Sequence, residues 1–256
     1  MIWSFILVTS IANMAAPIQR LAKLASRTFS MFGSAEGFQL DRLAQLRSAF
    51  NEITAADVNF DCNLIKERDR LSRNKAPVTY IHLWEDESFS MGIFVVKNGG
   101  RLPLHDHPGM FGLLKVIHGT MKIVSLTELQ DAGAPPREIS RGLQRWQIPL
   151  VKSVKMESEK TLSVGQECCQ LTPSSGNFHE ITAVSEMAAF VDILAPPYDQ
   201  SGARDCHYYS EVPISDVSKA NDVRWIIRVP QPQDFWCDSV DYTGPDLHHM
   251  RDTLTT

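Results

Sequence analysis

The spacing of apolar residues changes once along the chain, close to residue 78. Upstream of that point, two groups of apolar residues recur every three or four positions, which places each group on one face of a helix. The first group is Ile18, Leu21, Ala22, Ala25 and Phe29, and the second is Leu40, Leu43, Leu46 and Phe50. We therefore predict two amphipathic helices that pack on a larger core, followed by a charged, solvated stretch over 66–75.

From residue 78 onward, short runs rich in β-branched and aromatic residues alternate with turn signals, as is typical of strands. The predicted strands are Val78–Trp84, Phe89–Val96, the segment around His105 and His107, Leu113–Ile117, Met121–Leu126, Gln147–Val154, Thr161–Leu171, Glu180–Thr182 and Ala188–Leu194. Many short strands at fairly even spacing, with helices mainly at the N-terminus, indicate a mostly β protein that forms a sandwich or barrel.

The length of 256 residues suits one such domain, which we place at 36–256 after an N-terminal extension at 1–35. The apolar run over 2–11 is too short to cross a bilayer and follows no basic residue. Met14 offers an alternative start, which makes the first thirteen residues an upstream extension. Residues 19–31 are basic and lack acidic side chains, as mitochondrial presequences do. We favour an amphipathic helix packed on the barrel and keep the presequence as the alternative.

Charge and cysteine usage narrow the class of protein. The net charge of −5 opposes nucleic-acid binding, which normally needs a basic stripe. The five cysteines are odd in number and form no Cys-x-x-Cys pair, which favours a reducing, intracellular compartment. They are Cys62, Cys168, Cys169, Cys206 and Cys237. We expect a cytoplasmic monomer, with a mitochondrial location as the alternative, and no membrane or nucleic-acid partner.

Three histidines form the strongest chemical signal. His105 and His107 are separated by one residue, so on a strand both rings point to the same side, while Asp106 points to the other. The glycine-flanked layout over 99–119 resembles the first metal motif of the cupin superfamily. Pro-x-x-Gly-x-x-His over 173–179, which ends in His179, resembles the second. The resemblance implies a double-stranded β-barrel, or jelly roll, whose strands bring the three imidazoles together.

The predicted metal site contains no carboxylate. Many cupins place an acidic ligand three or four residues after the second histidine, where this chain has Phe111 and Gly112. Imidazole suits Fe, Zn, Cu and Ni, so the ligands alone leave the metal open. Three protein ligands leave coordination positions free, which is a catalytic arrangement. With Fe(II), such a site accepts an anionic sulfur donor and dioxygen, and this is the chemistry of a thiol dioxygenase.

Longer motifs then point to one family. Residues 102–110, Gly112–Val116 and Asp192–Tyr198 closely resemble the cysteamine dioxygenase and plant cysteine oxidase family of cupin thiol dioxygenases. The resemblance runs from about Leu40 to about Trp236. It implies an Fe(II) enzyme that adds both atoms of O2 to a thiol and gives a sulfinic acid. The implied substrate is cysteamine, which yields hypotaurine, or the N-terminal cysteine of a protein, which links oxygen level to a degradation signal in the hypoxia response.

Three further residues are candidates for catalysis. Asp192 lies in an apolar strand, where it faces either solvent or the active site. The resemblance favours the site, where Asp192 contacts the substrate ammonium or orients a ligand histidine. Cys206 and Tyr208 share one face of an extended segment. A buried cysteine beside tyrosines is the ordinary interpretation. The resemblance implies a Cys206–Tyr208 thioether and a Tyr208 hydroxyl that donates to developing charge.

Some alternatives stay open at this level. Phe235 and Trp236 line a substrate entrance or simply pack in the core. A first alternative is that the protein is a cupin enzyme of different chemistry. The missing carboxylate and the Cys-x-Tyr segment argue against this alternative. A second alternative is a non-catalytic cupin that binds a metal or small ligand. The complete set of three histidines argues against it.

Overall fold

The computed structural model describes residues 15–30, 40–73, 75–130, 133–199, 202, 204–213 and 223–247. Its helical elements are α1 (Pro17–Phe29), α2 (Leu40–Asn51), η1 (Ala56–Val58), α3 (Cys62–Leu71), α4 (Arg137–Gly142) and η2 (Ile148–Leu150). Its strands are β1 (Val78–Glu85), β2 (Ser90–Lys97), β3 (Arg101–Asp106), β4 (Phe111–His118), β5 (Thr120–Glu128), β6 (Val151–Ser163), β7 (Cys169–Leu171), β8 (Phe178–Ala183), β9 (Met187–Ala195), β10 (Tyr208–Glu211), β11 (Val223–Val229) and β12 (Cys237–Ser239). The alternative start at Met14 and the residues before it lie outside the described ranges.

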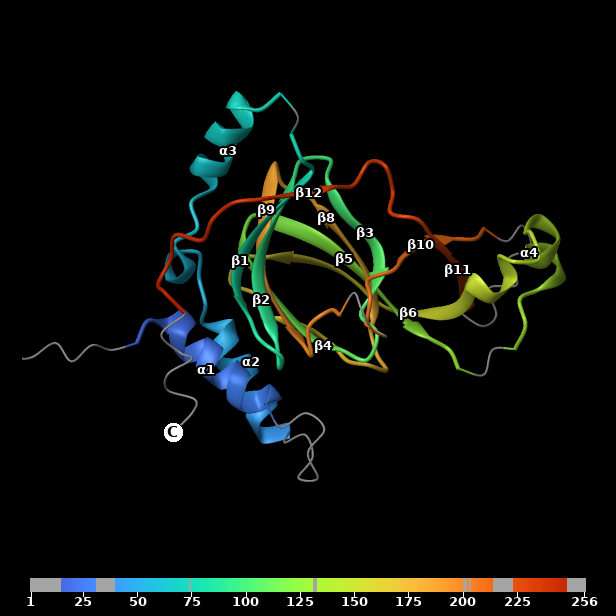
Figure 1. The fold of residues 1–256 in the computed structure, drawn as a ribbon, viewed down its shortest axis with the longest axis horizontal. Helices are drawn as coiled ribbons and strands as arrows, with labels where there is room; N and C mark the ends of the chain where they lie inside the picture. Colours follow the sequence, from blue (N-terminus) through green and yellow to red (C-terminus); the bar gives the residue numbers. More distant parts are fainter. Residues whose placement is uncertain are drawn as a thin grey trace, which may run out of the picture.

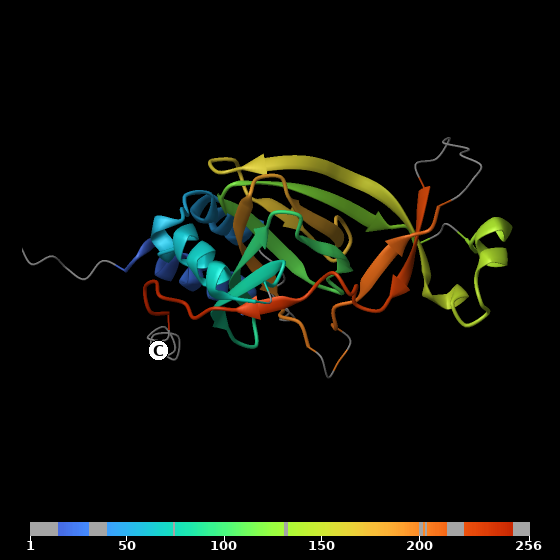
Figure 2. The same cartoon turned by 90° about the horizontal axis from the view of Figure 1, so that it is seen from above.

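The strands form two sheets that face each other (Figures 1 and 2). One sheet has the order β12-β1-β2-β9-β4-β7. The other has the order β10-β11-β6-β5-β8-β3 and closes through the pairing of β10 with β3. This arrangement confirms the predicted mostly β, cupin-like fold with helices on the outside.

Helices α1 and α2 cover the outer face of the first sheet (Figure 1). The five apolar residues predicted for the first helix are all buried there, and so are Leu43, Leu46 and Phe50 of α2. Leu40 is 75% exposed, so the apolar stripe of α2 begins one turn later than the spacing predicted. None of the helices in the described ranges is long and apolar enough to cross a membrane.

Strand β9 shows how this layering determines the direction in which Asp192 points. Ala189, Val191 and Ile193 face the helices, while Ala188 and Phe190 face the other sheet. Because side chains alternate along a strand, Asp192 and Leu194 continue the inward-facing row. Every residue of β9 is buried, so a solvent-facing Asp192 is ruled out.

Two stretches differ from the sequence-based expectation. The two strands predicted over 147–154 and 161–171 are replaced by η2, the single long strand β6, and the short strand β7. The polar middle of β6 lacks an apolar pattern, and its pairing with β5 keeps it extended. The charged stretch over 66–75 lies partly within helix α3, whose N-cap Asp61 accepts a hydrogen bond from the Asn63 backbone at 2.8 Å. Only Ile65 of α3 is buried, which explains the weak helical signal.

Candidate metal centre

Neighbouring strands of the closed sheet place the site residues in one row. His105 on β3 lies opposite His179 on β8, and Tyr208 on β10 lies opposite His105. Cross-strand partners point to the same face of a sheet, so all three side chains face the interior. His107 follows the last residue of β3 and remains on the same side as His105.

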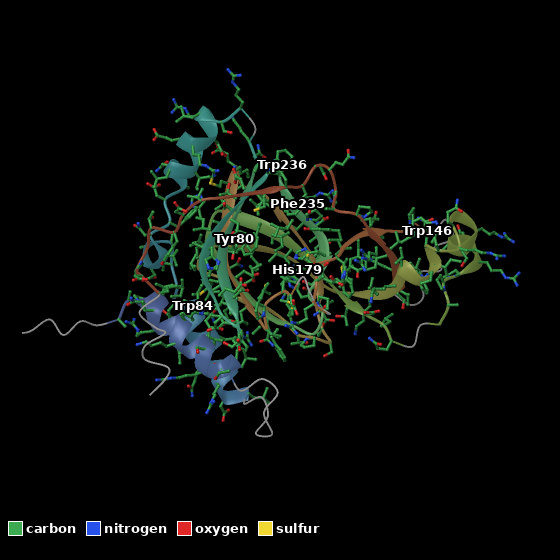
Figure 3. The ribbon with its side chains drawn as sticks, in the orientation of Figure 1. Tyr80, Trp84, Trp146, His179, Phe235 and Trp236 are labelled. Atoms are coloured by element: carbon green, nitrogen blue, oxygen red, sulfur yellow. The ribbon has the colours of Figure 1, made fainter. Side chains whose placement is uncertain are left out.

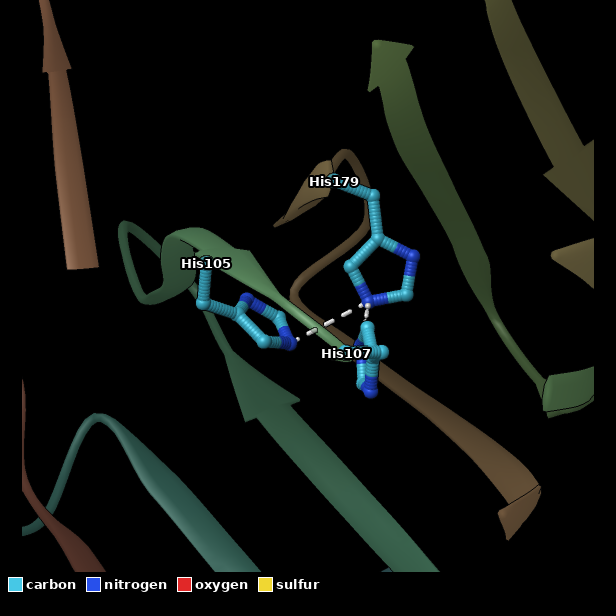
Figure 4. Close-up of side chains that lie close together, drawn as sticks. All are labelled: His105, His107 and His179. Carbon is cyan, nitrogen blue, oxygen red and sulfur yellow. Dashed lines mark hydrogen bonds between the residues drawn. The ribbon is translucent and has the colours of Figure 1, made fainter. Parts of the chain in front are cut away.

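The three imidazoles converge on one point (Figure 4). The Nε2 atom of His179 lies 3.0 Å from Nε2 of His107 and 3.2 Å from Nε2 of His105. The candidate ligand atoms all lie within 4.8 Å of one another, and the three residues are buried. Ring nitrogens gathered this closely fit a single metal ion, and no carboxylate of the described residues belongs to the group.

The surroundings keep these rings neutral and orient their lone pairs. Burial lowers the pKa of all three histidines, and for His107 and His179 the neighbouring imidazoles lower the pKa further. The Nδ1 of His105 donates to the carbonyl of Pro103 at 2.7 Å, because a carbonyl only accepts. Nδ1 protonation leaves Nε2 with its lone pair directed at the metal position.

Tyr198 performs the same task for His107. Its hydroxyl donates to the backbone carbonyl of Asp106 at 2.7 Å and therefore accepts from Nδ1 of His107, also at 2.7 Å. Asn177 holds the backbone at this point, since its amide donates to the His107 carbonyl at 2.6 Å. Sequence reasoning assigned no role to either residue. The only available signals were the position of Asn177 inside the second metal motif and of Tyr198 at the end of the Asp192–Tyr198 motif.

Asp106 faces away from the metal position, as the alternation of side chains along a strand predicts. Its carboxylate links β10 and the residues before it to β3 through hydrogen bonds. Its carboxylate accepts from the His207 backbone at 2.9 Å, from His207 Nδ1 at 3.2 Å and from the Tyr209 hydroxyl at 2.8 Å. These bonds fix the segment that carries Cys206 and Tyr208 against the strand that carries His105. Asp106 is thus a positioning residue.

Replacing Asp106 by alanine is expected to lower the free energy of unfolding by about 1–3 kcal/mol, because the buried Tyr209 hydroxyl loses its acceptor. The turnover number falls as well, since Tyr208 is held less firmly. Chemical denaturation and steady-state kinetics measure both effects. Asp106→Asn should recover part of each, and Tyr209→Phe, which removes one of the three bonds, should cost less. Equal stability of Asp106→Ala and Tyr209→Phe would argue against this fastening role.

The triad lines the wall of a cavity of about 140 Å³. Asp192, Cys206 and Tyr208 also line it, so the structure brings all six candidate site residues together. The remaining walls are mostly apolar, formed by Phe94, Leu102, Pro103, Ile181, Phe190, Leu194 and Phe235, with Tyr198. Apolar walls with a few convergent polar groups are typical of small-molecule sites.

Asp192 supplies the acidic group of the cavity. Burial raises the pKa of its carboxyl to about 7, although a hydrogen bond from the backbone of Ile193 acts in the opposite direction. A carboxylate in this position gains most from a cationic partner, because a buried charge is costly unless it is paired.

Cys206 contacts two phenols. Its thiol lies within hydrogen-bonding reach of the hydroxyls of Tyr198 and Tyr208, and burial raises its pKa to about 11. Burial likewise raises the pKa of Tyr208 above its usual range, with a further contribution from Cys206. Both groups therefore remain protonated at neutral pH and face the cavity as hydrogen-bond donors.

Comparison with known proteins agrees with this geometry. A family model described as PCO_ADO matches residues 49–247. The 2-aminoethanethiol dioxygenase of Mus musculus is 40% identical over 253 residues, covering 92% of this chain and 98% of that protein. Plant cysteine oxidase 1 of Arabidopsis thaliana is 30% identical over 226 residues, covering 87% and 73% respectively. The chain belongs to the PCO_ADO family. The predicted family and thiol dioxygenase function are thereby confirmed.

Solved structures give a weaker likeness. A cupin family protein from Methanocaldococcus jannaschii, described as having a double-stranded β-helix fold, is 15% identical and has a TM-score of 0.30. The match covers 49% of this chain and 86% of that one.

Proposed function

We propose that this PCO_ADO protein uses Fe(II) held by His105, His107 and His179 to oxidise the thiol of a 2-aminoethanethiol unit to a sulfinic acid. We propose that this unit is cysteamine or the N-terminal cysteine of a peptide. The mouse relative is named for 2-aminoethanethiol and the Arabidopsis relative for cysteine, and both compounds contain this unit. The observation that carries the proposal is the convergence of three buried, neutral imidazoles beside a cavity whose acidic group, Asp192, is also buried.

The residues present fit ferrous iron. Their three nitrogen donors are uncharged, which leaves the ion its full charge and therefore favours an anionic sulfur donor. When bound, iron supplies positions for the thiolate and for dioxygen and the redox chemistry that joins both oxygen atoms to sulfur. The protein's own contribution is to orient the substrate and exclude water.

Asp192 orients the substrate through its amine. The carboxylate and the triad line the same small cavity, so an ammonium two carbons from the sulfur pairs with Asp192 while the sulfur faces the histidines. This pairing offsets the cost of burying both charges and favours an aminothiol over a simple thiol.

The Tyr208 hydroxyl would donate a hydrogen bond to the negative charge that develops on oxygen during the reaction, and the phenol keeps its proton. Cys206 lies beside the phenol, and we include in the proposal that the two form a thioether. The thiol and the ring each lose a hydrogen atom to an oxidant, dioxygen, as the C–S bond forms. An intact mass lower by two hydrogen atoms than the sequence mass is the expected readout.

Tyr208→Phe is expected to lower kcat by about 10- to 100-fold with little change in KM, because losing one donor aimed at developing charge costs up to roughly 1,000-fold in other enzymes. Steady-state oxygen consumption measures both constants. Cys206→Ser is the matched control, since it retains the phenol and prevents the thioether. A kcat for Tyr208→Phe equal to that of the wild type would remove the hydroxyl from the reaction.

The direct test of the reaction is mass spectrometry after aerobic incubation of the iron-loaded protein. Cysteamine and a Cys-initiated peptide should each gain two oxygen atoms, whereas an N-acetylated peptide, which cannot present an ammonium to Asp192, should gain none. Absence of the gain on both free amines would overturn the proposal. We place this reaction in the cytoplasm and assign it to a monomer, with a mitochondrial location as the alternative.

A further inference from the structure

The cavity beside the triad continues into a wider groove of about 670 Å³. This volume lies within the roughly 300–1,000 Å³ typical of ligand sites, whereas the inner cavity, at about 140 Å³, lies below that range. The residues that line both spaces are Phe94, Asp192, Leu194, Tyr198, Tyr208 and Phe235. A substrate whose sulfur and amine fill the inner cavity therefore has a path into the groove.

The groove has aromatic walls from two parts of the chain. Tyr80 on β1 forms one side, and Phe235 and Trp236 in the segment before β12 form another (Figure 3). Trp236 is 39% exposed and Phe235 stacks at an angle near Tyr208, with ring centroids 5.8 Å apart. The entrance interpretation of Phe235 and Trp236 thus gains support from their position, since both line this groove.

In the groove, the ring of Tyr80 lies across residue 92, which is possible because that residue is glycine. A Cβ added to Gly92 would lie 2.5 Å from the Tyr80 hydroxyl, far inside van der Waals contact. Gly92 on β2 is the register partner of Asp192 on β9. The phenol therefore lies over the strand pair that carries the proposed amine-binding group, and its ring packs on Phe94 with centroids 4.9 Å apart.

The Tyr80 hydroxyl is available to a ligand. Among the described residues the Tyr80 hydroxyl has no hydrogen-bond partner, and the side chain is only partly exposed. Burial raises the pKa of this phenol, and the nearby Asp192 raises it further, so the hydroxyl stays protonated and able to donate. A peptide carbonyl that binds beside Tyr80 loses its hydrogen bonds to water and needs such a donor to replace them.

We propose that the groove binds the residues that follow an N-terminal cysteine, and that Tyr80 donates a hydrogen bond to the first peptide group as the chain leaves the inner cavity. This inference rests on the proposed function. Cysteamine has no peptide group, so Tyr80 distinguishes the two substrates while the inner cavity treats them alike. Tyr80 is thereby a specificity residue for the peptide.

The test is the ratio of kcat/KM for a Cys-initiated pentapeptide to kcat/KM for cysteamine. Tyr80→Phe should lower this ratio by about 5- to 10-fold, the value of one net hydrogen bond, through KM of the peptide. Tyr242→Phe, a partly buried tyrosine on the helix-covered side, is the matched control and should leave the ratio unchanged. An unchanged ratio in Tyr80→Phe would overturn the inference, whether kcat/KM falls equally for both substrates or for neither.

A second measurement uses the wild-type protein and avoids any folding defect of the variant. KM should decrease from cysteine amide to a Cys-initiated dipeptide and again to longer peptides until the groove is filled. A KM independent of peptide length would show that the groove does not bind the chain and would overturn the inference. If no substrate gains oxygen at all, the proposed function itself fails, so the two failures are distinguishable.

Discussion

Replacing His179 by alanine is expected to remove iron from the protein and abolish thiol oxidation while the two sheets stay folded. His179 contributes the Nε2 atom nearest to both other imidazoles, so its loss leaves two ligands in a buried site. Iron affinity should fall by more than about 100-fold, because even groups that only orient a ligand histidine are worth roughly 10- to 100-fold. Metal analysis after anaerobic loading measures the loss, and circular dichroism verifies the fold.

His118→Ala is the matched control for this experiment. His118 ends β4, is only partly buried, and does not belong to the three-histidine group. The control should retain iron and turnover close to the wild type. Full iron content in His179→Ala would exclude His179 from the metal site, and equal loss in both variants would indicate a general folding defect.

Replacing Asp192 by asparagine is expected to stabilise the metal-free protein at pH 8. Burial raises the pKa of this carboxyl from 3.8 to about 7, so between these values the folded state holds a proton that the unfolded state has released. Stability therefore falls as pH rises through this window, and the full penalty is present above pH 7. The difference between the pKa of this carboxyl in the folded and the unfolded protein corresponds to roughly 4 kcal/mol, which is the upper limit of the expected gain.

Denaturant unfolding of metal-free wild type and Asp192→Asn at pH 8 and pH 4 measures this effect. The gain at pH 8 should disappear at pH 4, where the wild-type carboxyl is also neutral. A gain of equal size at both pH values would attribute it to packing and not to charge. Ser90→Ala is the matched control, because it changes a side chain that lines the groove without altering charge. Thr79→Val is unsuitable, because the Thr79 hydroxyl donates a hydrogen bond to Asp238.

The same substitution should weaken the enzyme. Without a carboxylate, Asp192→Asn loses its partner for the substrate ammonium, and KM for cysteamine should rise by about 10- to 100-fold, the scale of one desolvated charge-assisted bond. In the wild type, KM should rise as pH falls and Asp192 becomes protonated. Bound iron lowers the pKa of a nearby carboxyl, so this rise begins below pH 7 in the loaded enzyme. A pH-dependence of KM that is identical in the variant would assign it to another group.

Much of the fold was predictable because its signals are local. The helical spacing of α1, the β-branched and aromatic runs of β1 and β2, and the His-x-His segment each depend on residues close in sequence. The metal triad was predictable only because two separated motifs occurred in the cupin order. The long strand β6 was not, since backbone pairing with β5 keeps its polar middle extended and leaves no pattern of apolar residues.

The supporting interactions of the site were harder to foresee. Tyr198 meets His107 across 91 positions, and Asp106 meets Tyr209 across 103 positions. The contact of Asp106 with Tyr209 follows from the register of β3 with β10, and Tyr198 comes from the segment that follows β9. The composition of a single strand encodes neither arrangement. Gly92 is a similar case. A larger side chain at this position would clash with the ring of Tyr80, which lies on the neighbouring strand.

The measurement that bears most directly on the metal centre is iron K-edge X-ray absorption of the Fe(II)-loaded protein, before and after anaerobic addition of cysteamine. Three imidazole ligands should be present before addition, and a sulfur neighbour at about 2.3 Å, the typical metal–thiolate distance, should be present afterwards. Two results would contradict a ferrous site formed by His105, His107 and His179 that receives a thiol. One is a protein carboxylate bound to iron, and the other is a spectrum with no sulfur neighbour after cysteamine has been added.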